Sequence, residues 1–160
     1  RDGQADYRLF GHSAGAQFAH RMHLLLPDHR ASVVVAANAG WYLMPEWRSD
    51  KAQAKFPYSM VDGPVAGEAA VRRALGRKLV VMVGANDTDP QHADLDRSDG
   101  AMKQGATRVD RGEAFFAAAS GATRDLGMAG AWELHLVEGA AHESSKMVRA
   151  AADRLFGKGK

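Results

Sequence analysis

Three short segments, far apart in the sequence, hold the side chains best suited to nucleophilic catalysis. The first is GHSAG at residues 11–15, which fits the G-x-S-x-G pattern. In that pattern the serine occupies a tight turn between a strand and a helix, so its neighbours must be small and its hydroxyl projects outward. Ser13 is therefore the candidate nucleophile, and the N–H of Ala14 is the candidate donor to an oxyanion. The alternative is a glycine-rich turn that only packs a helix against a strand.

A serine hydroxyl needs a base to react near neutral pH. His142 lies in EGAAHE, residues 138–143, between the last expected strand and the last expected helix. From such a loop an imidazole can reach over the end of a sheet toward Ser13, although a solvated loop histidine is the plainer alternative.

A third residue must orient the imidazole and stabilise its charged form. Asp87 and Asp89 both lie in GANDTDP, residues 84–90, directly after an apolar strand-like segment. We favour Asp87 because it comes sooner after the strand, whereas Asp89 stands beside Pro90 and is typical of a turn. Both aspartates stay open as candidates.

Other polar clusters do not have the spacing of a known site. His20 and His23 are three residues apart on an expected helix and could form a metal-binding pair, but no third ligand is evident, so we expect surface residues. The acidic residues between positions 87 and 99 do not follow the EF-hand spacing. We expect a solvated loop there, with no metal site and no cofactor.

The elements that would position these side chains follow from periodicity. Apolar runs predict strands at 7–10, 32–37, 78–83 and 133–137, while helical spacing predicts helices at 14–25, 65–75, 108–126 and 144–156, the last capped by Ser144. Residues 94–105 look polar and irregular. Strands that alternate with helices predict an α/β fold, with a parallel sheet flanked by helices. In such sheets ligands bind at the carboxyl ends of the strands, where all three candidate loops begin.

Residues 41–75 form a long insertion between two expected strands. Its first half is rich in aromatic side chains, namely Trp41, Tyr42, Trp47, Phe56 and Tyr58. Such a segment could form a lid or a pocket wall for an apolar ester, or could simply fill the core below the loop. If it is a pocket, Trp41 and Tyr42 are the expected substrate-binding residues because they directly follow a strand.

Composition limits the remaining possibilities. The chain has 160 residues, no cysteine and a net charge of only +2, with no basic block. We therefore expect one domain over residues 1–160, no nucleic-acid partner and no membrane-spanning segment. The lack of cysteine does not fix the compartment.

Several segments resemble the α/β-hydrolase superfamily, and more specifically its bacterial esterase and polyhydroxybutyrate-depolymerase-like branch. They are YRLFGHSAGAQFAHRM, AANAGWY, VMVGANDTDP, QGATRVDRGEAFF and VEGAAHES. The resemblance implies hydrolysis of a small-molecule carboxylic ester through an acyl-enzyme, with Ser13, Asp87 and His142 as the triad. A serine peptidase or amidase on the same fold, or a catalytically silent binding domain, are the alternatives.

The chain departs from the superfamily in one respect. Such enzymes carry several strands before the serine turn, and a loop among them supplies a second oxyanion donor. Here that turn begins at residue 11. We therefore expect the N-terminal strands to be missing, so that this is a partial domain completed by a further N-terminal segment or a second chain and weakly active by itself.

Overall fold

The computed structural model describes residues 5–26 and 28–157 of the chain. In this part, strands and helices alternate along the sequence. They are β1 (Tyr7–His12), α1 (Ala14–Leu25), β2 (Ala31–Ala37), α2 (Glu68–Leu75), β3 (Leu79–Gly84), α3 (Asp99–Met102), α4 (Arg108–Asp125), β4 (Trp132–Val137) and α5 (Ser144–Phe156). None of the helices described is both long and apolar enough to cross a membrane.

The strands form one four-stranded sheet in the order β1-β2-β3-β4, with every neighbouring pair parallel. Each parallel pair is joined by a connection that runs back along the sheet, as parallel pairing requires. The expected α/β class with a parallel sheet is therefore confirmed. Because all strands point the same way, the loops after β1, β3 and β4 leave the same edge of the sheet.

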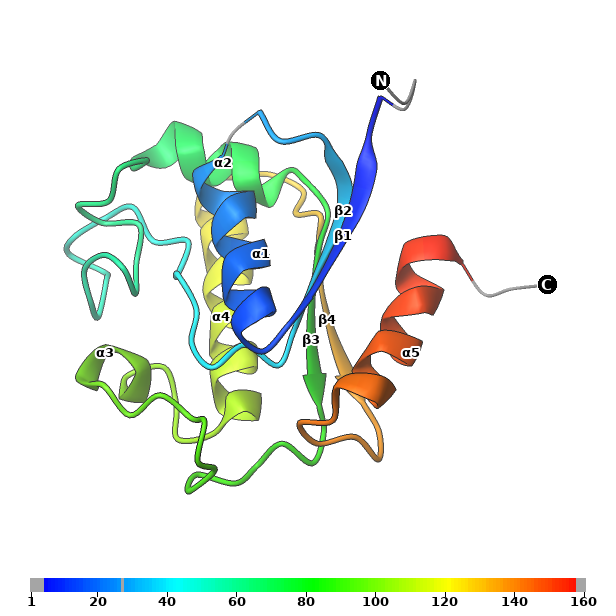
Figure 1. The fold of residues 1–160 in the computed structure, drawn as a ribbon. Coiled ribbons are helices and arrows are strands. Elements are labelled where there is room, and N and C mark those ends of the chain that lie inside the picture. The colour runs from blue at the N-terminus through cyan, green and yellow to red at the C-terminus, as the bar shows by residue number, and fades with distance from the viewer. Residues whose placement is uncertain (1–4, 27, 158–160) are drawn as a thin grey trace.

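Helices cover both faces of this sheet (Figure 1). Helices α1, α2 and α4 lie on one face and α5 on the other. The central strands alternate between the two cores: Val34, Ala36 and Val81 face the larger one, whereas Val35 and Val80 face the core under α5. Strands buried on both faces read as continuous apolar runs, which explains the composition of SVVVAA and KLVVMV.

Three local expectations differ from the structure. A single helical turn, α3, occupies Asp99–Met102 in the segment expected to be irregular. Helix α2 begins at Glu68 rather than at residue 65. Ser144 is the first residue of α5 and not its cap; Glu143 holds the cap position without a side-chain capping bond.

His20 and His23 are not surface residues. Both are fully buried, because α1 is covered by α2 and by the long insertion as well as by the sheet. The Nε2 of His20 accepts a hydrogen bond from the Leu43 N–H, and its Nδ1 contacts the Ala16 carbonyl. Burial lowers the pKa of His20 to about 3 and that of His23 to about 4, so both stay neutral and serve the core.

Residues 41–75 are largely irregular before α2. A bridge between Met44 and Ser59 closes the first part of the segment into a loop, which two backbone bonds at Met44 reinforce. Leu43, Met44 and Met60 are buried in the larger core. This part of the insertion is therefore anchored to the domain by apolar packing.

Candidate active site

The turn at Ser13 is tightly constrained. Ser13 follows β1 with φ 54° and ψ −117°, a left-handed conformation that is costly for a residue other than glycine. Its N–H donates to the Ala37 carbonyl at 2.9 Å, which ties the turn to the end of β2. A Cβ added at Gly11 would lie 2.1 Å from the Gly15 carbonyl oxygen, so only glycine allows the strand and helix to approach this closely. The turn presents a hydroxyl at the carboxyl end of the sheet.

Ala14 begins α1 directly after the serine. The first N–H groups of a helix have no partner within the helix, and the helix dipole places partial positive charge there. Within the described residues, nothing accepts a hydrogen bond from the Ala14 N–H, and Ala14 is exposed. That N–H is therefore free to bind an anionic oxygen formed at Ser13.

The loop that carries His142 is positioned by the end of β3 and by Asn38. A Cβ at Gly84 would meet the Ala141 and Ala140 carbonyl oxygens at 2.2 and 2.6 Å, so glycine is needed where the loop crosses β3. Asn38 is fully buried; it accepts from the Gly84 N–H at 2.8 Å and donates to the Ala141 carbonyl at 2.7 Å. One amide therefore joins the ends of β2 and β3 to the residue before His142.

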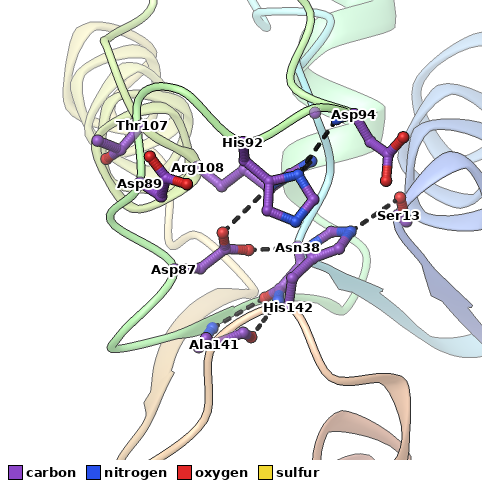
Figure 2. Close-up of polar contacts among 12 residues, drawn as sticks. Ser13, Asn38, Asp87, Asp89, His92, Asp94, Thr107, Arg108, Ala141 and His142 are labelled. Carbon is purple, nitrogen blue, oxygen red and sulfur yellow. Dashed lines mark hydrogen bonds and ion pairs between the residues drawn. The ribbon is translucent and has the colours of Figure 1, made fainter.

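Three side chains from separate loops form a continuous relay (Figure 2). The Nε2 of His142 lies 3.2 Å from the Ser13 hydroxyl, and its Nδ1 lies 2.8 Å from a carboxylate oxygen of Asp87. Asp87 is buried, whereas His142 is partly exposed and Ser13 is reachable from solvent. A buried carboxylate on Nδ1 orients the ring so that Nε2 faces the hydroxyl, which is the geometry of a base beside a nucleophile.

The structure separates the two candidate aspartates. Asp87 contacts His142, while Asp89 is exposed and accepts a hydrogen bond from the Gln91 N–H at 2.8 Å. Asp89 therefore serves the turn after the loop and does not touch the imidazole.

Arg108, which the sequence analysis did not select, is part of the same cluster. Its guanidinium lies 3.1 Å from the second oxygen of Asp87, and both side chains are almost completely buried, at 1% and 2% exposure. Burial by itself would raise the pKa of Asp87, but the hydrogen bond from His142 and the charge of Arg108 outweigh it and hold that pKa below its usual value. The carboxylate is therefore ionised at neutral pH.

Two solved structures resemble this chain in fold and sequence. One is a poly(aspartic acid) hydrolase-1 from Sphingomonas sp. KT-1, at TM-score 0.88 and 38% identity, covering 96% of this chain and 56% of the neighbour. The other is LpqC, a poly(3-hydroxybutyrate) depolymerase from Bordetella parapertussis, at TM-score 0.84 and 29% identity, covering 95% and 49%. The chain has an α/β-hydrolase fold. The resemblance to the esterase and polyhydroxybutyrate-depolymerase-like branch is thereby confirmed.

The chain spans about half the length of these two neighbours. The comparison with protein-family models gave no match, and neither did the comparison with curated proteins.

Two further imidazoles flank His142. The rings of His12 and His92 lie 4.8 and 5.2 Å from that of His142, measured between ring centroids. Burial and the neighbouring His142 lower the pKa of His12, so His12 remains neutral beside His142. His92 comes from the loop after β3, which sequence reasoning had treated as a solvated acidic segment.

The structure corrects one expected substrate contact. Tyr42 is fully buried and stacks on Phe115 at 4.5 Å, and its backbone is held by the Gln104 side chain. It is a core residue, because the chain turns inward as soon as it leaves β2. Trp41 is half-buried; its ring lies 4.9 Å from Tyr58 and beneath the Arg21 guanidinium.

Within residues 5–26 and 28–157, no group of three or more His, Cys, Asp and Glu side chains could hold a metal ion.

Proposed function

We propose that this chain carries the nucleophile, the base and the acid of a serine hydrolase that cleaves carboxylic esters through an acyl-enzyme. The observation that carries the proposal is the relay from the Ser13 hydroxyl through His142 to Asp87, with contacts of 3.2 and 2.8 Å. Both solved neighbours are named for polymer hydrolysis, which supports a hydrolytic reaction.

In the proposed first half-reaction the Ser13 oxygen attacks the ester carbonyl while Nε2 of His142 takes the hydroxyl proton. Asp87 stabilises the imidazolium that forms. The negative charge on the carbonyl oxygen is stabilised by the N–H of Ala14. Collapse of the intermediate expels the alcohol, which receives the proton from Nε2. Water then repeats the sequence on the acyl-enzyme, releasing the acid and restoring Ser13.

Amide hydrolysis by the same residues is the second candidate. The neighbour of higher identity is named for poly(aspartic acid), whose repeating units are joined by amide bonds. The amine released from an amide is a poorer leaving group than the alcohol released from an ester, so this alternative requires stronger proton donation by His142. Comparing an ester and an amide of the same acid distinguishes the two.

A second oxyanion donor would come from outside the described residues. We propose that a further segment or a second chain supplies it beside β1, which pairs only with β2 in the part described. Loss of one such donor costs about 3–4 kcal/mol of transition-state stabilisation. The 160-residue polypeptide is therefore expected to turn over esters slowly by itself.

We also propose that Trp41 lines the acyl pocket, with residues 41–75 as its wall. Trp41 follows the end of β2 and is only half-buried, and its aromatic side chain suits an apolar acyl chain.

Labelling with a fluorophosphonate tests the nucleophile directly. We expect covalent labelling of Ser13 and release of alcohol from a short-chain nitrophenyl ester, with both lost in Ser13→Ala. Ser145→Ala is a matched control, since Ser145 is an exposed serine of α5. A silent binding domain would not be labelled, and labelling that persists in Ser13→Ala would refute the assignment.

A further inference from the structure

His92 lies on the loop between β3 and α3, and its ring contacts His142, the base of the proposed relay. Its ring lies edge-to-face with His142 at 5.2 Å between centroids, and Figure 2 shows it next to His142, between Arg108 and Asp94. In ester hydrolysis the base returns its proton to the leaving alcohol, so the alcohol lies against the imidazole as it leaves. His92 is thus placed to contact the alcohol portion of a substrate.

The contacts of His92 fix which nitrogen carries its proton. Its Nδ1 faces two groups that can only donate, the Asp94 N–H at 3.2 Å and the Arg108 guanidinium at 3.4 Å. Nδ1 must therefore be the acceptor, and the proton resides on Nε2.

The Nε2–H of His92 has no acceptor among the described residues. His92 is half-buried. Some side-chain nitrogen and oxygen atoms are fully buried and have no hydrogen-bond partner, but Nε2 of His92 is not one of them. It therefore remains accessible as an N–H donor beside His142. An N–H donor suits a carbonyl oxygen.

We propose that His92 is a specificity-determining residue that donates from Nε2 to a carbonyl oxygen in the leaving group of the substrate. Arg108 is its positioning residue, since one guanidinium holds Asp87 and the Nδ1 of His92 together. The inference rests on the proposed ester hydrolysis and deepens it. It selects esters whose alcohol portion carries a further acyl group, as the next unit of a polyester does, over esters of simple alcohols.

A matched pair of esters tests the proposal in the protein encoded by the complete gene. Isopropyl butyrate and methyl 3-(butyryloxy)butanoate share one acyl group and a secondary leaving alcohol, but only the second alcohol carries a carbonyl. The release of butyrate is the readout, and the measured quantity is kcat/KM for the second ester divided by kcat/KM for the first. We expect His92→Leu to lower this ratio by about tenfold, which is the effect of one lost hydrogen bond.

His92→Gln retains an N–H at the end of the side chain and should recover most of that ratio. Gln91→Ala, an exposed neighbour on the same loop, should leave it unchanged. If His92→Leu leaves the ratio of the two kcat/KM values unchanged, the proposal is overturned. An equal loss of kcat/KM for both esters would then mean that His92 only packs against His142.

A binding measurement separates this inference from the proposed function. Imidazole ¹⁵N spectra should show the His92 proton on Nε2, and methyl 3-hydroxybutanoate should shift that resonance and bind about tenfold more weakly to His92→Leu. If neither ester is cleaved, the proposed function fails, and this titration alone decides the role of His92. A proton on Nδ1, or equal binding by both proteins, would refute it.

Discussion

Replacing Arg108 by methionine should destabilise the protein strongly at neutral pH. Methionine has a similar length, but it leaves the Asp87 carboxylate buried without its cation, with only His142 as a side-chain partner. Removing one member of a fully buried ion pair costs about 3–5 kcal/mol, because the remaining charge is uncompensated. Urea unfolding followed by tryptophan fluorescence would measure the loss.

The loss should depend on pH in a defined direction. In the native protein the pKa of Asp87 lies below its usual value, so the carboxylate contributes stability at neutral pH that is lost as the pH falls through that lowered value. In Arg108→Met the burial of Asp87 is no longer opposed by the guanidinium, so its pKa rises. The difference in unfolding free energy between the two proteins should then shrink as the pH falls from the raised pKa of Asp87 in the variant to its lowered pKa in the native protein, because protonation removes the unpaired charge.

Two controls isolate the charge pair. Arg124→Met changes an exposed arginine of the same helix and should alter the unfolding free energy by less than about 0.5 kcal/mol. Adding Asp87→Asn to Arg108→Met should cost less than the sum of the two single changes, because the double variant has no unpaired charge. A loss below about 1 kcal/mol at pH 7, or one that is the same at acid pH, would refute this account of the pair.

Three further substitutions test the arrangement around His142. Asp87→Asn should lower kcat about 10⁴-fold because it favours the wrong imidazole tautomer, whereas Asp89→Asn should change kcat little; similar losses would place the acid elsewhere. Gly84→Ala should cost about 1–3 kcal/mol in urea unfolding and reduce kcat, since the added methyl group meets two carbonyl oxygens of the His142 loop, and an unaltered protein would contradict the close approach. Asn38→Ala should lower the free energy of unfolding by about 2–4 kcal/mol, because it leaves two backbone groups unpaired. Asn86→Ala, which changes an exposed asparagine, should have little effect, and equal effects of the two substitutions would disprove the bridging role of Asn38.

The sheet and the three loops could be predicted from the sequence because each rests on a local signal. The runs SVVVAA and KLVVMV are apolar at successive positions, as strands buried on both faces require, and both are central in the sheet. The serine turn combines a motif with a strand before it and a helix after it. Parallel strands then bring loops distant in sequence to one edge without any further information.

The sequence could not decide between Asp87 and Asp89 as the residue that contacts His142. The two residues differ by two positions in one loop, and only the path of the chain after Gly84 decides which carboxylate turns inward. The burial of His20 and His23 was mispredicted for a related reason. Helical spacing shows one apolar face of α1, but α1 is covered on a second side by the insertion, which has no periodic signal.

Arg108 left a trace in the sequence that local reasoning could have used. Thr107 and Asp110 form a capping box, so the helix start is well defined and Arg108 is the first residue of α4. A cation there opposes the helix dipole, which favours negative charge at this end. The unfavourable interaction is worth only about 0.3–1 kcal/mol, and a contacting anion offsets it. Acidic residues are frequent in the segment before this helix. A charge placed against the dipole thus points to an anionic partner without naming it, and in the structure that partner is Asp87, the buried carboxylate that contacts His142.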